Sequence, residues 1–188
     1  MTSPVAALWR RLDAPGHDAC RLEPTDDGWR LRGTAVFRHD GRPARLDYVV
    51  TCDGAWRTRA GTVDGWIGAR AVALDVHRAR DGTWRLNGVP VPGLDDCVDV
   101  DFGFTPATNA LQLRRVALAP GAAAEVPVAW LDAADGTLTR LAQRYERQGD
   151  DDGTAYAYAA PRFAYRAVLE VDASGFVRHY PGLWIAER

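Results

Sequence analysis

Four acidic or thiol side chains occupy alternate positions of one short segment, and two arginines follow it in the sequence: Asp95, Cys97, Asp99 and Asp101, then Arg114 and Arg115. In an extended strand, alternate side chains lie on the same face. Carboxylates held this close repel one another unless a cation, an arginine or water compensates. We expect Arg114 and Arg115 to return beside the acidic segment as an antiparallel neighbour.

Three interpretations of this segment are open. An Asp–Arg network can support a ligand site, or the charges can belong to a purely structural or solvated strand. Alternatively, Asp99 and Asp101 form a carboxylate pair for acid–base or metal chemistry, but no histidine or glutamate lies close in sequence to complete such a site. Asn109 either stabilises the turn that contains Pro106 or offers its amide to a polar ligand.

The rest of the sequence argues against most common enzyme classes. Lysine is absent, which rules out a Walker A phosphate loop and lysine Schiff-base chemistry. The serines are Ser3 and Ser174, and Ser174 falls in a predicted hairpin turn, so a serine hydrolase is not indicated. Neither the histidines nor the three widely spaced cysteines show metal-binding spacing. We therefore predict no catalytic residues, no metal and no cofactor. A net charge of −2 without basic clusters argues against nucleic acid as a partner.

Turn signals and period-two alternation predict a mainly β fold. Asp-Gly and Asn-Gly pairs tolerate the positive φ of tight hairpin turns, and they recur at residues 27–28, 40–41, 53–54, 64–65, 81–82, 87–88 and 135–136. Between them, apolar and polar side chains alternate, as around Leu46, Tyr48 and Val50. We expect a curved antiparallel sheet that forms a half-barrel or an open barrel.

Two segments, residues 3–12 and 137–147, fit a helix and a strand equally well, so we expect at most one or two short helices. No linker divides the chain, and residues 1–188 are predicted to form a single β-rich domain. There is no integral membrane segment and no signal-peptide pattern, and the three unpaired cysteines suit a reducing compartment. We expect a cytoplasmic protein. The sequence does not predict its oligomeric state.

The segment Asp99-Val-Asp-Phe-Gly-Phe-Thr-Pro-Ala-Thr-Asn-Ala-Leu-Gln-Leu-Arg-Arg115 resembles the hallmark block of a bacterial family of glycolipid-binding proteins. Supporting similarities lie at residues 48–59, 81–84, 143–145, 171–177 and 180–184. The chain departs from the family pattern at Leu111-Gln-Leu113, where Leu-Pro-Ile is expected at the entry of a strand. The resemblance implies a half-barrel similar to bacterial lipoprotein carriers and lipid-binding folds, and it brings no catalytic residues.

Seven tryptophans and six tyrosines make an aromatic-walled cavity for an amphipathic molecule, a lipid or glycolipid, the leading hypothesis. We expect tryptophans to line it, arginines to meet an anionic or sugar headgroup, and further polar and tyrosine side chains to complete the site: Trp56, Trp130 and Trp184; Arg57, Arg59 and Arg115; Tyr48, Asp99, Asp101, Asn109 and Tyr145. One alternative is an enzyme that acts on a sugar or lipid headgroup through Asp99 and Asp101. Another is an interaction module with an exposed sheet edge.

Overall fold

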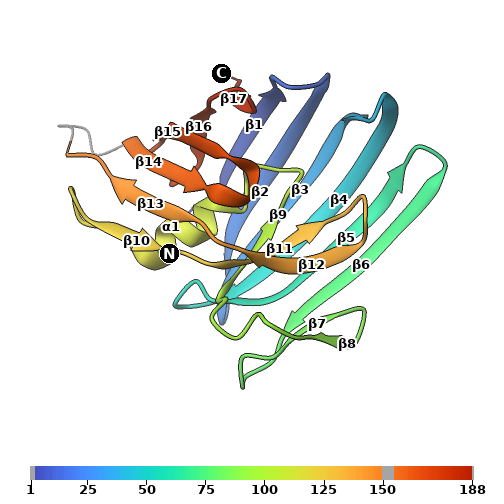
Figure 1. Cartoon of the computed structure of the whole chain (residues 1–188), viewed down its shortest axis with the longest axis horizontal. Helices are drawn as coiled ribbons and strands as arrows, with labels where there is room; N and C mark the ends of the chain where they lie inside the picture. Colours follow the sequence, from blue (N-terminus) through green and yellow to red (C-terminus); the bar gives the residue numbers. More distant parts are fainter. Residues whose placement is uncertain (1–2, 150–154, 188) are drawn as a thin grey trace.

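One large antiparallel sheet dominates the computed structural model, which describes residues 3–149 and 155–187. Within these residues the sheet has 14 strands, and the first and last strands of the chain, β1 and β17, pair near its middle. The sheet curves strongly but does not close into a barrel (Figure 1). In sheet order its strands are β10 Ala123–Glu125, β13 Arg144–Arg147, β14 Ala155–Ala160, β15 Tyr165–Val171, β16 Val177–Tyr180, β17 Trp184–Ala186, β1 Val5–Arg11, β2 Gly16–Thr25, β3 Gly28–His39, β4 Arg42–Asp53, β5 Thr58–Ile67, β6 Arg70–Arg78, β7 Trp84–Leu86 and β8 Val89–Val91.

A second layer covers the inner face of this sheet. It consists of a three-stranded sheet, β9 Asp99–Phe102, β11 Val128–Asp132 and β12 Thr137–Leu141, together with helix α1, Asn109–Val116. Figure 1 shows these strands in front of β3 to β6, and the ring of Phe102 packs edge-on against Tyr48 of the large sheet. A one-turn 3-10 helix, Pro161–Phe163, joins β14 to β15. The prediction of a curved antiparallel sheet with one or two short helices is confirmed.

Alternation along the strands creates the core between the two layers. Strand β4 buries every second side chain from Ala44 to Cys52, while the side chains between them face outward and are at least partly exposed. Burial of each large apolar side chain contributes roughly 1.5–3 kcal/mol, so this alternation fixes which face of the sheet carries the second layer.

Most of the Asp-Gly and Asn-Gly pairs form the predicted hairpin turns. At Asp40-Gly41 and Asn87-Gly88 both residues have positive φ, as a two-residue hairpin loop requires. The prediction was wrong at Asp64-Gly65, which lies inside β5. Gly65 has a φ of 154°, and a Cβ atom there would lie 2.0 Å from the carbonyl oxygen of Arg45. Glycine is needed at this position for the close approach of two strands.

The segment from Asp95 to Arg115 differs from our expectation in two ways. Asp95 and Cys97 precede β9, so the shared strand face holds Asp99 and Asp101 alone. Residues 109–116 form α1 where we expected an antiparallel strand. Ala, Leu, Gln and Arg favour a helix, and five successive residues from Asn109 to Leu113 are buried, which a strand with one solvated face cannot achieve.

Both ambiguous segments are strands. Residues 5–11 form β1, which pairs with β2 on one side and β17 on the other, and the fully buried Trp9 donates its indole N–H to the carbonyl oxygen of Val177 at 2.6 Å. Residues 137–147 contain β12 and β13. Pairing with neighbouring strands decides both segments, and their own periodicity does not contain that information.

The close approach at Gly65 predicts a large loss of stability on substitution. We expect Gly65→Ala to lower the free energy of unfolding by roughly 2 kcal/mol or more, because the new Cβ atom collides with the backbone of β4. Gly54→Ala is the matched control: no heavy atom lies within 4 Å of its Cβ position, and we expect a change within about 0.5 kcal/mol. Urea denaturation measures both. Equal midpoints for the two variants would contradict the strand register described here.

Candidate functional site

A cavity of about 380 Å³ lies between the second layer and the C-terminal part of the large sheet. This volume falls in the range of small-molecule sites, roughly 300–1,000 Å³. Seven of its lining side chains are aromatic: Phe102, Trp130, Tyr158, Phe163, Tyr165, Tyr180 and Trp184. The remaining lining residues are Asp101, Gly103, Thr105, Asn109, Leu141, Ala160 and Leu183.

Three tyrosines from successive strands form one wall. Tyr158 of β14, Tyr165 of β15 and Tyr180 of β16 pack with ring centroids 5.4–6.1 Å apart. The sequence favours this arrangement because tyrosine alternates with alanine along β14, so one face of the strand is aromatic and the other is small. The Tyr165 hydroxyl donates to the carbonyl oxygen of Pro181 at 2.6 Å, which fixes the orientation of that ring.

Trp130 forms the opposite wall and depends on a glycine. A Cβ atom on Gly103 would lie 2.8 Å from both Nε1 and Cζ2 of the Trp130 indole, so only glycine allows the ring to lie against the backbone there. Trp130 and Gly103 also line a second cavity of about 230 Å³, next to Arg11 and Phe37. The indole of Trp130 thus borders two cavities.

Asp101 supplies the acidic group of the cavity. Its side chain is largely buried, and it accepts hydrogen bonds from the Thr108 hydroxyl at 2.9 Å and the Gln143 amide at 2.6 Å. Burial raises the pKa of Asp101 above that of an exposed aspartate, and its interactions with Thr108, Gln143 and Gln112 partly oppose the rise. Among the ion pairs of residues 3–149 and 155–187, none involves Asp101.

Asn109 and Tyr145 belong to a neighbouring hydrogen-bond network. The Asn109 amide donates to the Tyr145 hydroxyl at 2.7 Å, and this hydroxyl donates to the side-chain oxygen of Gln112 at 2.8 Å. Asn109 lines the cavity, whereas Tyr145 lies behind it and is fully buried. The network fixes the start of α1 against β13.

Asp99 has a different role from Asp101, although both lie on the same face of β9. Its fully buried carboxylate pairs with Arg115 in the last turn of α1, with N–O distances of 2.8–2.9 Å. Burial raises the pKa of Asp99, and the Arg115 guanidinium opposes this rise. Neither residue lines the cavity. The pair connects α1 to β9.

Tyr48 contacts the cavity wall from behind. Its hydroxyl donates to the buried Asp18 carboxylate at 3.0 Å and lies 3.2 Å from the hydroxyl of Thr105, which lines the cavity. Thr105 also donates a hydrogen bond to Asp18. Burial raises the pKa of Asp18 to about 7, because its nearest polar partners are neutral hydroxyl groups.

The expected headgroup arginines lie elsewhere. Trp56, Arg57 and Arg59 belong to the β4–β5 hairpin, and none of them lines the cavity. Trp56 stacks on Trp29 with ring centroids 4.2 Å apart, and Arg59 pairs with Asp27 at the surface. The structure therefore brings Asp101, Asn109, Trp130 and Trp184 of the expected set to the cavity wall, with Tyr48 and Tyr145 directly behind it.

Sequence reasoning missed the tyrosine wall and Phe163. The signal is present in part, because Phe163 and Tyr165 begin an alternation of apolar and polar side chains that runs to Val171 and is typical of a strand. That pattern gives the face of a strand but not which neighbouring strands share it, and the grouping of Tyr158, Tyr165 and Tyr180 arises only from the pairing of β14, β15 and β16.

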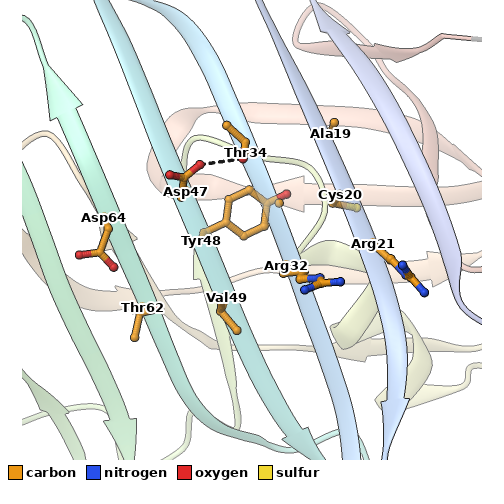
Figure 2. Close-up of a pocket in the computed structure, with 11 residues that line it drawn as sticks. Ala19, Cys20, Arg21, Arg32, Thr34, Asp47, Tyr48, Val49, Thr62 and Asp64 are labelled. Carbon is orange, nitrogen blue, oxygen red and sulfur yellow. Dashed lines mark hydrogen bonds between the residues drawn. The ribbon is translucent and has the colours of Figure 1, made fainter.

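A second depression, of about 420 Å³, lies on the outer face of the large sheet (Figure 2). Side chains of β2 to β5 surround it, with Arg21 and Arg32 on one side and Asp47 and Asp64 on the other. Thr34 donates to Asp47 across it at 2.7 Å. Arg21 and Arg32 pair with Glu23, and Asp47 pairs with Arg45, so most of these charges already have partners. The Tyr48 ring is buried. The inner cavity is the better candidate for a binding site.

The described part of the chain contains neither a candidate metal site nor a membrane-spanning helix. No group of three or more His, Cys, Asp or Glu side chains there is placed to hold a metal ion. Within the same residues, no helix is sufficiently long and apolar to span a bilayer. The three cysteines are buried and unpaired with one another.

Fold and cavity together define an open, curved β-sheet protein with an aromatic-lined internal cavity. Residues 6–186 match the family described as "Putative glycolipid-binding", and the chain belongs to this family. It is also similar to the crystal structure of a DUF1089 family protein from Pseudomonas aeruginosa, with 26% sequence identity, a TM-score of 0.75, and coverage of 97% of this chain and 91% of that chain. No match was found among proteins of curated function. The resemblance inferred from the Asp99–Arg115 block is confirmed.

The buried Asp18 predicts a specific dependence of stability on pH. Its pKa is about 7 in the folded protein and near 3.8 when exposed, so the folded state holds the proton more tightly between these values. The free energy of unfolding therefore falls as pH rises from about 4 to about 7 and loses nothing more from this group above that range. The contribution is at most on the order of 4 kcal/mol.

Asp18→Asn tests this assignment. The variant should lose less stability than the wild type between pH 4.5 and pH 8, measured by urea denaturation across that range. Asp99 and Asp101, whose pKa values are also raised, give both proteins a remaining slope of the same sign. Asp40→Asn, at an exposed hairpin turn, serves as the control and should follow the wild type. Parallel curves for Asp18→Asn and the wild type would refute the assignment.

Proposed function

We propose that this protein binds an amphipathic molecule, a lipid or glycolipid, in the cavity between its two sheets. The observation that carries the proposal is the composition of the wall: seven aromatic side chains and three polar ones, Asp101, Thr105 and Asn109. Aromatic rings bind both the apolar faces of sugar rings and alkyl chains, and a few polar groups fix the orientation of a ligand. The description of the family supports the same class of ligand.

The size of the cavity limits what it can enclose. At roughly 30 Å³ for each water-sized group, 380 Å³ holds on the order of a dozen non-hydrogen atoms. That is one hexose ring or a short alkyl chain, but not both. The remainder of a larger amphiphile must extend beyond the cavity, and each methylene group that it buries there contributes about 0.8 kcal/mol.

The alternative of an enzyme with two carboxylates receives less support. Paired acid–base catalysis requires both carboxylates to face the same substrate. Asp99 is occupied by Arg115 and does not line the cavity, which leaves Asp101 as the carboxylate on the wall. This arrangement favours binding over hydrolysis.

The alternative of an interaction module is also less supported. The edge strands of the large sheet, β8 and β10, have three residues each, and β8 contains Pro90. Short edges interrupted by proline offer few free backbone groups for pairing with another chain.

Binding of an alkyl glucoside tests the proposal. We expect octyl glucoside, at concentrations below its critical micelle concentration, to quench the intrinsic tryptophan fluorescence saturably, because Trp130 lines the cavity. Trp130→Ala and Phe163→Ala should weaken binding at least tenfold, a loss of about 1.4 kcal/mol, measured by calorimetry. Phe163 is 49% exposed, so its truncation leaves the core intact.

Trp66→Ala is the matched control. Trp66 is an aromatic side chain of β5 that is 38% exposed and does not line the cavity, so its removal should leave the affinity unchanged. Equal effects of Trp66→Ala and Phe163→Ala would show that amphiphiles bind the surface nonspecifically, and the proposal would then fail.

A further inference from the structure

The charged side chains around the cavity are unevenly distributed. Among the residues that the structure describes, Asp101 is the one acidic or basic side chain in the cavity lining, and no arginine or histidine is found there. From this we infer that the polar end of the ligand carries a positive charge, as in an alkylammonium headgroup, and that Asp101 and the surrounding aromatic rings bind it. The inference rests on the proposed function, because it concerns the headgroup of that same ligand.

Asp101 has capacity for a further partner. A carboxylate offers about four acceptor positions, and Thr108, Gln143 and the nearby Gln112 amide account for at most three of them. All of these donors are neutral, so they do not balance a negative charge. A buried carboxylate without a countercharge is costly, and a cation that enters the cavity from outside removes that cost.

Asp101 and Trp130 lie side by side. They are register partners across the parallel strands β9 and β11, and both line the cavity. The electron-rich face of an indole attracts a cation, and tyrosines do so more weakly. A carboxylate next to several such rings is the arrangement by which proteins bind quaternary ammonium groups, because the rings replace water around the methyl groups while the carboxylate balances the charge.

The aromatic walls already interact with cations on the protein itself. The Arg162 guanidinium lies 5.0 Å from the centre of the Trp130 ring, and that of Arg11 lies 5.1 Å from the centre of the Trp184 ring. Neither arginine lines the cavity, so neither balances Asp101 from within it.

An anionic headgroup does not fit this wall. Arg115 is the expected headgroup arginine that lies nearest to Asp101 in the sequence, and it is paired with the buried Asp99. Arg59 is paired with Asp27 at the surface. An anion in the cavity would face Asp101 with no basic side chain beside it, and like charges at short distance repel.

Three amphiphiles with the same eight-carbon chain test the inference: octyltrimethylammonium, octyl glucoside and octyl sulfate. We expect octyltrimethylammonium to bind at least tenfold more tightly than either of the others by calorimetry at pH 8. Asp101→Asn should weaken binding of the ammonium compound at least tenfold and weaken binding of the glucoside by a clearly smaller factor. Affinity for the ammonium compound equal to or below that for the glucoside would overturn the inference, as would equal effects of Asp101→Asn on both ligands.

A comparison on the wild type alone covers the case in which Asp101→Asn does not fold. Choline and its uncharged isostere 3,3-dimethylbutan-1-ol have the same shape, so a preference for choline of tenfold or more in displacing octyltrimethylammonium reports the charge itself. No preference would overturn the inference. If octyl glucoside still binds in a manner that depends on Phe163, the proposed function stands; if none of the three amphiphiles binds, both proposals fail.

Discussion

The rest of the site depends on strand β9, because this strand buries two carboxylates. Buried carboxylates require hydrogen-bond or ion-pair partners within the protein. All four residues of the strand are buried, and its alternation directs Asp99 and Asp101 to one face and Val100 and Phe102 to the other. The apolar pair packs against the large sheet, as the contact of Phe102 with Tyr48 shows. The acidic pair must then find partners within the second layer. Arg115 meets this need for Asp99 and thereby determines where α1 lies.

The two carboxylates differ in their partners. Asp99, closed off by Arg115, holds the helix in place. Asp101, bonded only to neutral donors, keeps an unbalanced acidic group at the cavity wall. The cavity exists because the large sheet curves around the second layer without closing. Gly103 allows the Trp130 ring to lie against the backbone, between this cavity and the second, smaller one. The ion pair of Asp99 with Arg115 thus lies next to a carboxylate, Asp101, that has no ion-pair partner among the described residues.

The sequence predicted the fold class well, since its signals for hairpins and alternating strands are local. Asp40-Gly41 and Asn87-Gly88 mark their turns through backbone preference alone. The errors occurred where distant partners decide. Position 65 requires glycine because the backbone of β4 lies close to it. Residues 109–116 form a helix in which five successive residues, from Asn109 to Leu113, are buried. The Asp99–Arg115 pair was anticipated from charge, but from a strand rather than a helix. The tyrosine wall required the pairing of three strands, which no local pattern reports.

In the function that we propose, an amphiphile occupies the space between Trp130 and the tyrosine wall. The most direct measurement is a crystal structure with an octyl glucoside analogue that carries bromine on its alkyl chain, located by the anomalous scattering of bromine. We expect ordered ligand density in contact with Trp130 and Tyr180, with the bromine in or at the opening of the cavity. Bromine in the outer depression beside Arg21 and Asp47, with the inner cavity closed by its own side chains, would contradict the proposal.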